Sequence, residues 1–145
     1  MIKTGLYNWH KINSANIVSY AGYLLPVYYS SIVNEHNSVR KNAGLFDVSH
    51  MGEFLITGEN AERFVQLVTI NDVSKLSTGK AQYTAMCDHN GGIIDDVIVY
   101  KLNKGFMMVV NSANIKKDFE WLNSNAIGDV KLDNKSDGIG LISIQ

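Results

Sequence analysis

Apolar side chains recur at helical spacing in three segments of the chain. The segments 32–43, 61–68 and 113–123 each place apolar residues three or four positions apart, which is typical of amphipathic helices. Each segment follows a residue whose side chain can cap a helix N-terminus, namely Ser31, Asn60 and Ser112. The pattern therefore predicts three helices.

Other segments have the alternating or continuous apolar pattern of strands. They are residues 51–57, 81–87, 93–102, 106–111, 129–132 and 139–144. Turn sequences that contain glycine, DHNGG and NKG, join neighbouring strands as hairpins. The resulting order is strand, helix, several antiparallel strands, helix and strand. This order predicts an α+β domain of the ferredoxin-like, split βαβ type, with an antiparallel sheet and helices on one face.

The beginning and the end of the chain fit this domain less well. The stretch before Ser31 is rich in aromatic residues, with Tyr7, Trp9, Tyr20, Tyr23 and Tyr28. We therefore expect residues 1–50 to form an arm and a helix that contribute to a neighbouring lobe, and residues 51–145 to form the ferredoxin-like lobe. The strand-like ending GIGLISIQ suggests the N-terminal portion of a longer protein.

Composition narrows the class of protein. Hydrophobic residues make up 46% and charged residues 19% of 145 residues, which is typical of a folded domain. The formal charge is −1 without a Lys/Arg cluster, so we expect no nucleic-acid partner. No apolar run is long enough for a membrane-spanning helix. Cys87 is the only cysteine and the four histidines are scattered, so the sequence predicts no disulfide, no metal site and a reducing compartment.

The strand GGIIDDVIVYKL raises a question about chemistry, because two adjacent aspartates are unusual in a strand. Alternation places Asp96, Ile98 and Tyr100 on one face, together with Ile94. Asp95 lies on the opposite face with its apolar neighbours. One face therefore offers a carboxylate, an apolar wall and a phenol, which suits a flat heterocycle with polar edges.

Two residues outside this strand can join that face. Tyr83 lies on the partner strand of the hairpin, and Asn111 ends the following strand. Structural explanations are equally open at this point. Asp95 can bond to backbone near a bulge, Asp96 can pair with Lys101 or Lys80, and both tyrosines can serve packing alone. Periodicity by itself does not identify a reaction.

Longer motifs in the sequence resemble those of a known protein family. GLFDVSHMGE, GGIIDDVIVY and FMMVVNSANIKKDFEWL occur in this order, and the sequence from about Leu6 to Gln145 strongly resembles aminomethyltransferase, the T-protein of the glycine cleavage system. The family commonly has Trp where this chain has Tyr23, which preserves an aromatic ring. Its members are longer and usually continue with Gly-Pro after ISIQ. The resemblance thus implies an N-terminal portion from which the C-terminal lobes are absent.

The resemblance implies an activity and a set of residues. The enzyme transfers the methylene of an aminomethyl group, carried on the lipoyl arm of the H-protein, to tetrahydrofolate and releases ammonia. Asp96 would be the catalytic carboxylate, and Asp95 would be structural. Folate contacts carry over to Met51, Tyr83, Asp96, Ile98, Tyr100 and Asn111.

Related functions remain as alternatives. They are a folate-dependent demethylase and a non-enzymatic folate-binding protein, and a chain of this length can also be an inactive fragment. The absence of an Arg/Ser-rich presequence favours the bacterial cytoplasm over the mitochondrial matrix as the location.

Overall fold

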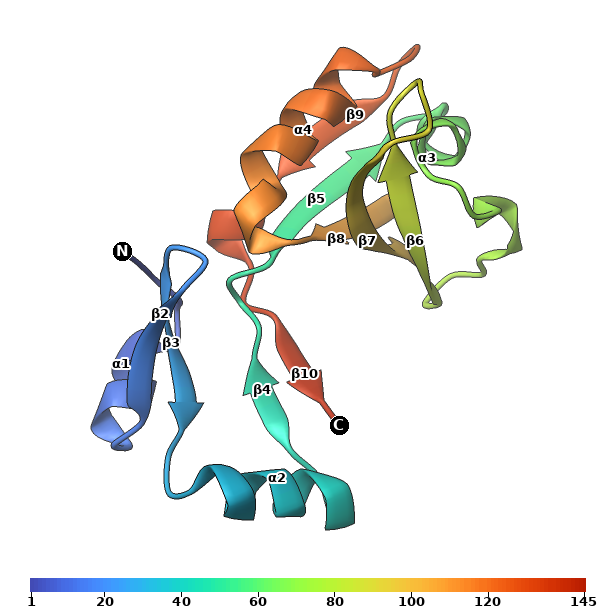
Figure 1. The fold of residues 1–145 in the computed structure, drawn as a ribbon. Helices are drawn as coiled ribbons and strands as arrows, with labels where there is room; N and C mark the ends of the chain where they lie inside the picture. Colours follow the sequence, from blue (N-terminus) through green and yellow to red (C-terminus); the bar gives the residue numbers. More distant parts are fainter. The chain divides into compact units, whose positions relative to one another are not determined.

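The structure is a computed structural model that describes all 145 residues, and the chain divides into two units. Unit 1 comprises Met1–His50 and Ile139–Gln145, and unit 2 comprises Met51–Gly138 (Figure 1). The assignment of residues 139–145 to the second lobe was therefore wrong. Strand β10 (Ile142–Ile144) pairs antiparallel with β4 (Leu45–Asp47), and these backbone hydrogen bonds tie the end of the chain to unit 1.

Unit 1 is built from short elements. They are β1 (Ile2–Lys3), α1 (Tyr7–Ile12), β2 (Asn16–Tyr20), β3 (Tyr23–Tyr28), α2 (Ile32–Lys41), β4 and β10. Its larger sheet has the order β1-β3-β2. A two-residue turn joins β2 to β3, with Ala21 at φ 47° and Gly22 at φ 86°. Positive φ at both positions matches the twist of an antiparallel hairpin, so the aromatic stretch forms strands that the sequence analysis did not predict.

Helix α2 begins as predicted. The Ser31 hydroxyl accepts a hydrogen bond from the N–H of Asn34 at 3.4 Å. The Glu35 carboxylate reaches back to accept from the N–H groups of Tyr29 and Ser30, at 2.8 and 2.7 Å. These bonds satisfy backbone donors that a helix start leaves unpaired. The helix ends at Lys41, two residues before the expected end.

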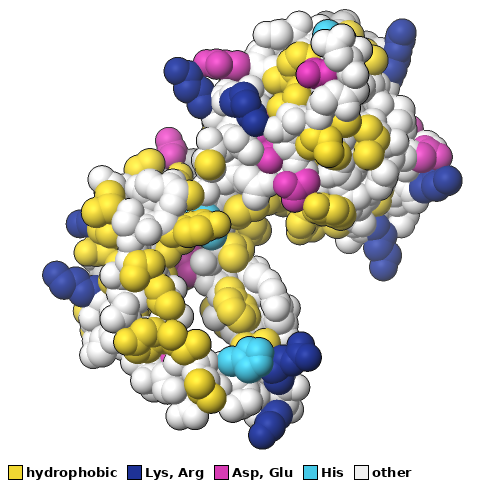
Figure 2. Space-filling model, viewed as in Figure 1, with side chains coloured by type: hydrophobic (Ala, Val, Ile, Leu, Met, Phe, Trp, Pro, Cys, Tyr) yellow, Lys and Arg dark blue, Asp and Glu magenta, His cyan; other side chains and the backbone are white.

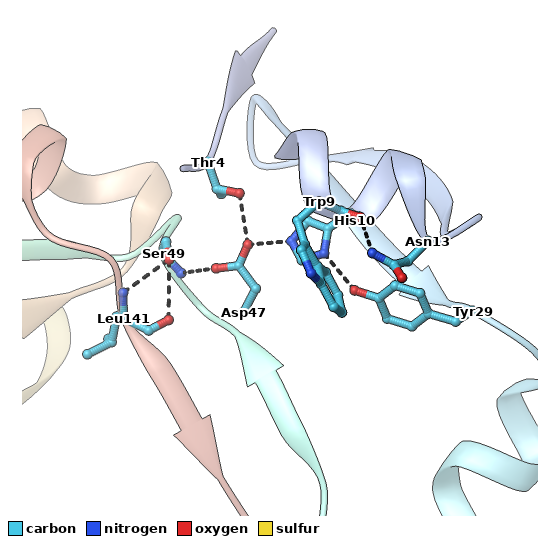
Figure 3. A network of polar contacts seen from close by, with 8 residues as sticks. All are labelled: Thr4, Trp9, His10, Asn13, Tyr29, Asp47, Ser49 and Leu141. Carbon is cyan, nitrogen blue, oxygen red and sulfur yellow. Dashed lines mark hydrogen bonds and ion pairs between the residues drawn. The ribbon is translucent and has the colours of Figure 1, made fainter. Parts of the chain in front are cut away.

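A buried polar network holds unit 1 together, and Figure 3 shows it. Asp47 Oδ2 lies 2.7 Å from His10 Nε2 and accepts from the Thr4 hydroxyl at 2.8 Å. Asp47 Oδ1 accepts from the N–H of Ser49 at 3.0 Å, and His10 Nδ1 lies 2.6 Å from the Tyr29 hydroxyl. These contacts join segments far apart in the sequence. Burial alone would raise the pKa of Asp47, but the bonds from His10, Ser49 and Thr4 outweigh it and lower that pKa.

Unit 2 is an α+β domain. Its elements are β5 (Gly52–Thr57), α3 (Ala61–Val68), β6 (Ala81–Cys87), β7 (Ile93–Lys101), β8 (Phe106–Val110), α4 (Ile115–Ser124) and β9 (Lys131–Asn134), with short 3-10 turns at Val73–Lys75, Ser112–Asn114 and Ser136–Gly138. The sheet is antiparallel throughout, with strand order β6-β7-β8-β5-β9. The predicted α+β class with an antiparallel sheet is confirmed.

The apolar core lies against one face of this sheet. Phe54 and Met108 face each other across β5 and β8, and Val99 faces Met108 across β7 and β8. Phe64 and Val65 of α3 and Leu122 of α4 complete the same core. Both helices therefore pack on one side of the sheet, and the side chains that point the other way are left to form a surface.

Two predicted helix caps were wrong. Asn60 does not cap α3, because its side-chain amide donates to Asp129 Oδ1 at 2.9 Å. Asp129 also accepts from the backbone N–H groups of Glu59 and Asn60, so a distant residue takes over the capping role. Ser112 lies in a 3-10 turn, and α4 begins after Asn114. No helix in the structure has the length and apolarity needed to span a membrane.

Candidate functional site

Strand β7 sorts its aspartates onto opposite faces of the sheet, as alternation predicts. Asp95, Val97 and Val99 are buried on the core side. Asp96 is exposed, and Ile98 and Tyr100 are partly buried on the other side. A bulge between Met86 and Cys87 on β6 shifts the register just beyond Asp95, which lies at the edge of the paired region.

The Asp96 carboxylate is held by side chains from both neighbouring strands. The Tyr83 hydroxyl on β6 donates to Asp96 Oδ2 at 2.9 Å. The Asn111 amide nitrogen, just after β8, donates to Asp96 Oδ1 at 3.1 Å and to the Asp96 carbonyl at 3.1 Å. Each carboxylate oxygen thus has one donor, and the structure brings together three of the predicted site residues.

The ion pair considered for Asp96 is not observed. Lys101 points to the core side of β7, where its ammonium lies 2.8 Å from Glu62 Oε2 and 4.1 Å from the centre of the Phe106 ring. No lysine neutralises the exposed carboxylate of Asp96, which therefore remains available to a ligand.

The remaining predicted residues follow from the strand register. Ile98 and Tyr100 share the face of Asp96, and Tyr100 pairs with Met107 of β8 and Ala81 of β6. Met51 directly precedes β5, in which Gly52 pairs with Val110. Continuing that register places Met51 level with Asn111, at the same end of the sheet. We refer to the surface formed by Tyr83, Asp96, Ile98, Tyr100 and Asn111 as the open face.

The electrostatics of the open face keep the Tyr83 phenol as a hydrogen-bond donor beside Asp96. The hydrogen bond to Asp96, and then the negative charge of Asp96, raise the pKa of the Tyr83 phenol. The phenol therefore keeps its proton at neutral pH and remains a donor. A carboxylate with fixed donors on its outer edges has lone pairs left to accept from N–H groups of a ligand.

Two further aspartates, Asp95 and Asp118, are buried on the core side of the sheet, opposite the open face. Asp95 Oδ1 accepts from the side-chain amides of Asn111 at 3.0 Å and Asn114 at 2.7 Å, and Oδ2 accepts from the Asn111 N–H at 3.2 Å. Asp118 of α4 is fully buried, and neither of its carboxyl oxygens has a hydrogen-bond partner. Burial, followed by the influence of the nearby Asp95, raises the pKa of Asp118 to about 8.

Sequence reasoning missed two buried acids. Asp118 lies three residues after Ile115 and four before Leu122, on the apolar stripe of the predicted helix, and this placement was the available signal. Glu53 sits within the apolar strand segment MGEFLI. Its carboxyl oxygens are buried without a hydrogen-bond partner, and burial raises the pKa of Glu53 to about 7.

A separate hollow lies within unit 1. It measures about 810 Å³ and is bordered by parts of β3, α2 and β4, and Figure 2 shows hydrophobic side chains around it. The Glu35 carboxylate in its lining already accepts three backbone N–H bonds at the start of α2. That carboxylate is therefore occupied, although the lining also includes His36, Ser38 and Arg40. No group of three or more His, Cys, Asp or Glu side chains is arranged to hold a metal ion.

The fold and the open face together define an α+β domain that presents one carboxylate, two phenols and aliphatic side chains on an uncovered sheet surface. Flat ligands with polar edges bind to such surfaces, because the rings pack on apolar walls while a few polar groups fix their orientation. Comparisons with known proteins identify the family.

The family model described as the GCVT N-terminal domain matches residues 6–145. A protein named aminomethyltransferase from Staphylococcus carnosus is 50% identical over 99% of this chain, and one from Chlorobium phaeobacteroides is 48% identical over 100%. The crystal structure of the glycine cleavage system aminomethyltransferase T from Bartonella henselae matches 99% of this chain with a TM-score of 0.89 and 30% sequence identity.

The chain therefore belongs to the GCVT N-terminal domain family, and the resemblance to aminomethyltransferase is confirmed. The chain spans about 40% of the length of these relatives.

Proposed function

We propose that this chain forms the part of a glycine cleavage aminomethyltransferase that holds the reactive end of tetrahydrofolate. In this reaction the two folate nitrogens form bonds to the methylene carbon of an aminomethyl group. The bonds from that carbon to nitrogen and to the lipoyl sulfur break. Ammonia leaves, the released sulfur of the lipoyl arm becomes a thiol, and methylenetetrahydrofolate is the product.

The observation that carries the proposal is the way the Asp96 carboxylate is presented on the open face. Tyr83 and Asn111 hold it at 2.9 and 3.1 Å, without a competing cation. A reduced pterin is a flat ring with N–H donors along its edge, so it can donate to Asp96 while it packs against Ile98 and Tyr100. A carboxylate in this position also accepts a proton as a folate nitrogen attacks, which typically accelerates such a step by about 10²-fold or more.

Each residue of the open face then has a separate role. Asp96 is the catalytic carboxylate. Tyr83 and Asn111 fix its orientation and keep it from rotating away from the ligand. Ile98, Tyr100 and Met51 form the wall against which the ring packs. The preorganised geometry means that little reorientation is needed when the ligand arrives.

The names of the relatives support the partner and the setting. The Bartonella henselae structure is described as part of the glycine cleavage system, and lipoyl-bearing H-protein is the donor that this proposal requires. The relatives named above are bacterial, which supports a bacterial cytoplasmic location for the proposed reaction.

The reaction is tested in a protein of the relatives' length. We suggest a chimaera in which this chain replaces the matching segment of the Staphylococcus carnosus aminomethyltransferase, since the two are 50% identical there. Aminomethyl-loaded H-protein and tetrahydrofolate are supplied, and methylenetetrahydrofolate and ammonia are measured. Asp96→Asn is expected to lower turnover by about 10²-fold or more. Asp137→Asn, an exposed acid of unit 2, is the matched control.

Full turnover by Asp96→Asn would remove this carboxylate from the mechanism. A chimaera that is folded but inactive, with its lipoyl-bearing partner and folate present, would contradict the proposed reaction for this chain.

A further inference from the structure

Unit 1 leaves most of its apolar side chains outside a core. Leu25 is its only buried apolar side chain, and all the other buried apolar side chains belong to unit 2. Helix α2 buries no residue at all. Five large apolar or aromatic side chains line the hollow of unit 1 and are between 38% and 67% exposed, namely Val27, Tyr29, Ile32, Leu45 and Phe46. Apolar surface that gathers around one hollow in this way marks an interaction site.

The hollow lies beside the unpaired edge of β4. Strand β10 covers one edge of β4, and none of Ile142–Ile144 lines the hollow, whereas all of Leu45–Asp47 do. The second half of β3 borders the hollow as well, and it pairs with β2 on one side, while β1 reaches only Tyr23 and Leu24 on the other. Figure 1 shows β4 with β10 on one side and β3 on the other. The hollow therefore separates two strands that do not pair with each other.

The ladder between β4 and β10 determines which backbone groups of β4 are free. Gly44 and Gln145 exchange two backbone hydrogen bonds, at 2.8 and 3.0 Å, and the Val48 N–H donates to the Leu141 carbonyl at 3.0 Å. In an antiparallel ladder, such hydrogen-bonded pairs alternate with pairs whose N–H and C=O groups point outward. Positions 44, 46 and 48 therefore bond to β10, and the positions between them face the other way.

The positions that face away from β10 are Leu45 and Asp47. Their two N–H and two C=O groups have no hydrogen-bond partner in the structure. A ribbon of only two strands is marginally stable in water. An edge with free backbone groups is also a template for pairing with a further strand. The free backbone groups and the apolar lining of the hollow thus lie on the same side of β4.

We propose that the hollow of unit 1 receives one further β-strand, which pairs with the free edge of β4 and belongs to the part of an aminomethyltransferase chain that this chain does not match. Main-chain hydrogen bonds to Leu45 and Asp47 hold the added strand. Alternate side chains of the strand enter the hollow and cover Val27, Ile32 and Phe46. The inference uses the family membership of the chain and is independent of the folate.

The lengths of the relatives favour this occupant over a separate protein. The match to this chain spans about 40% of each relative, so the larger part of their chains lies outside it. The Bartonella henselae protein has the same fold over 99% of this chain, with a TM-score of 0.89, and carries that larger part in addition. A segment of the same polypeptide docks at a high effective concentration, which a separate partner does not have.

The added strand would also secure the polar network of unit 1. Asp47 contributes its backbone to the free edge of β4 and its carboxylate to the contacts with His10 and Thr4. A strand that fixes the Asp47 backbone therefore restrains the network at the same residue. We expect unit 1 to open less often when the strand is present, and amide hydrogen exchange measures this opening.

The test compares this chain alone with the chimaera described above, both without folate. Amide exchange at single-residue resolution is recorded for β4 and corrected for intrinsic rates. In the chain alone, Leu45 and Asp47 should exchange much faster than Phe46, whose N–H faces Ser143 of β10. In the chimaera, Leu45 and Asp47 should slow by about tenfold or more relative to Phe46, because each gains an acceptor. An unchanged ratio to Phe46 would overturn the proposal.

A proline substitution tests the backbone bond itself. Leu45→Pro removes only an N–H that points away from β10, a position at which an edge strand tolerates proline. Leu45→Ala is the matched control, because it shortens the same side chain and keeps the N–H. In the chimaera, Leu45→Pro should raise the exchange rate of the Asp47 N–H by about tenfold more than Leu45→Ala does. Equal effects of the two substitutions would contradict strand pairing at this edge.

Two further measurements keep the result unambiguous. The chain alone is followed from 10 to 500 μM by sedimentation and by exchange. Protection of Leu45 that rises together with dimer formation would show that a second copy occupies the edge, and would overturn the assignment to the remainder of the chain. If the chimaera does not fold, the Staphylococcus carnosus protein gives the same comparison at the positions matched to Leu45, Phe46 and Asp47, and fast exchange there at the first and last positions would refute the proposal.

Discussion

Unit 1 and unit 2 each bury an aspartate, and the two aspartates have opposite surroundings. Asp47 of unit 1 has His10, Thr4 and the Ser49 N–H as partners, and these bonds lower its pKa despite burial. Asp118 of unit 2 has no N–H or O–H donor, and its pKa rises to about 8. A fully partnered buried anion is a structural feature, whereas an unpartnered one costs stability and points to a functional site.

The contrast extends to how each unit responds to pH. Asp47 has a lowered folded-state pKa, so its contribution to stability is present above the unfolded-state pKa near 4 and is lost as the pH falls. Asp118 has a raised folded-state pKa, so stability declines as the pH rises from about 4 to about 8. A falling pH therefore destabilises the network of unit 1, whereas a rising pH acts on the buried acids of unit 2, Glu53 and Asp118.

The largest expected effect comes from breaking the network of unit 1. Asp47→Ala leaves the His10, Thr4 and Ser49 donors without their shared acceptor, in a site where the two side chains of the pair are 3% and 1% exposed. Removing one member of a buried pair costs about 3 kcal/mol or more. Amide hydrogen exchange should show faster opening in β3 and β4. Asp137→Ala, an exposed substitution, should change little, and unaltered exchange in Asp47→Ala would remove the network from the account.

The next effect tests the unpartnered acid of unit 2. Asp118→Asn removes a buried group that ionises near pH 8, so the variant should retain only the part of the pH-dependent decline that other acids such as Glu53 cause. Relative to the unsubstituted chain, its free energy of unfolding should rise by about 2 kcal/mol between pH 6 and 8 and stay level above that. Urea unfolding at several pH values measures the difference. Parallel curves for the two chains would show that Asp118 does not ionise in this pH range.

A smaller effect is expected at Glu53, the other acid without a partner. Burial raises its pKa from 4.5 to about 7, so the unsubstituted chain loses stability as the pH rises through this interval. Glu53→Gln should reduce that loss by about 1 kcal/mol between pH 6 and 8, because the amide stays neutral. Paired urea titrations at these two pH values compare the chains. If both lose the same amount, Glu53 is already neutralised by another group.

The smallest effect is expected at an ion pair that belongs neither to the network of unit 1 nor to the buried acids of unit 2. Lys101 and Glu62 form an ion pair at 2.8 Å, but the Glu62 side chain is 53% exposed. An exposed pair contributes about 0.5 kcal/mol or less. Glu62→Gln should therefore leave the thermal midpoint nearly unchanged at moderate salt. A destabilisation as large as that of Asp47→Ala would mean that burial does not determine how much a charged side chain contributes to the stability of this chain.

Local patterns predicted the open face well, because the period of a strand is fixed by backbone geometry. Alternation alone separated Asp95 from Asp96, and the hairpin brought Tyr83 opposite the same strand. The assignment of β10 to the second lobe failed, because pairing of Ile142–Ile144 with Leu45–Asp47 is a contact between distant segments.

The sequence did not predict the cap of α3 or the buried acids for a related reason. Asp129 replaces Asn60 as the capping group of α3 from almost 70 residues away in the chain. The burial of Asp118 likewise depends on how α4 packs against the sheet. Sequence periodicity gives the face of each element, but it does not give the partner that tertiary packing supplies.

The central claim is that the open face of unit 2 receives the ring of a reduced folate at Asp96, and residue-resolved NMR tests it most directly. Tetrahydrofolate is added to the isotope-labelled chain, and the shifts of backbone amides, tyrosine rings and the Asn111 side chain are mapped. We expect saturating shifts at Tyr83, Asp96, Tyr100 and Asn111, and we expect Asp96→Asn to weaken the affinity by about tenfold or more, because a charged acceptor is lost. Saturating shifts confined to the hollow of unit 1, or unchanged affinity in Asp96→Asn, would contradict it.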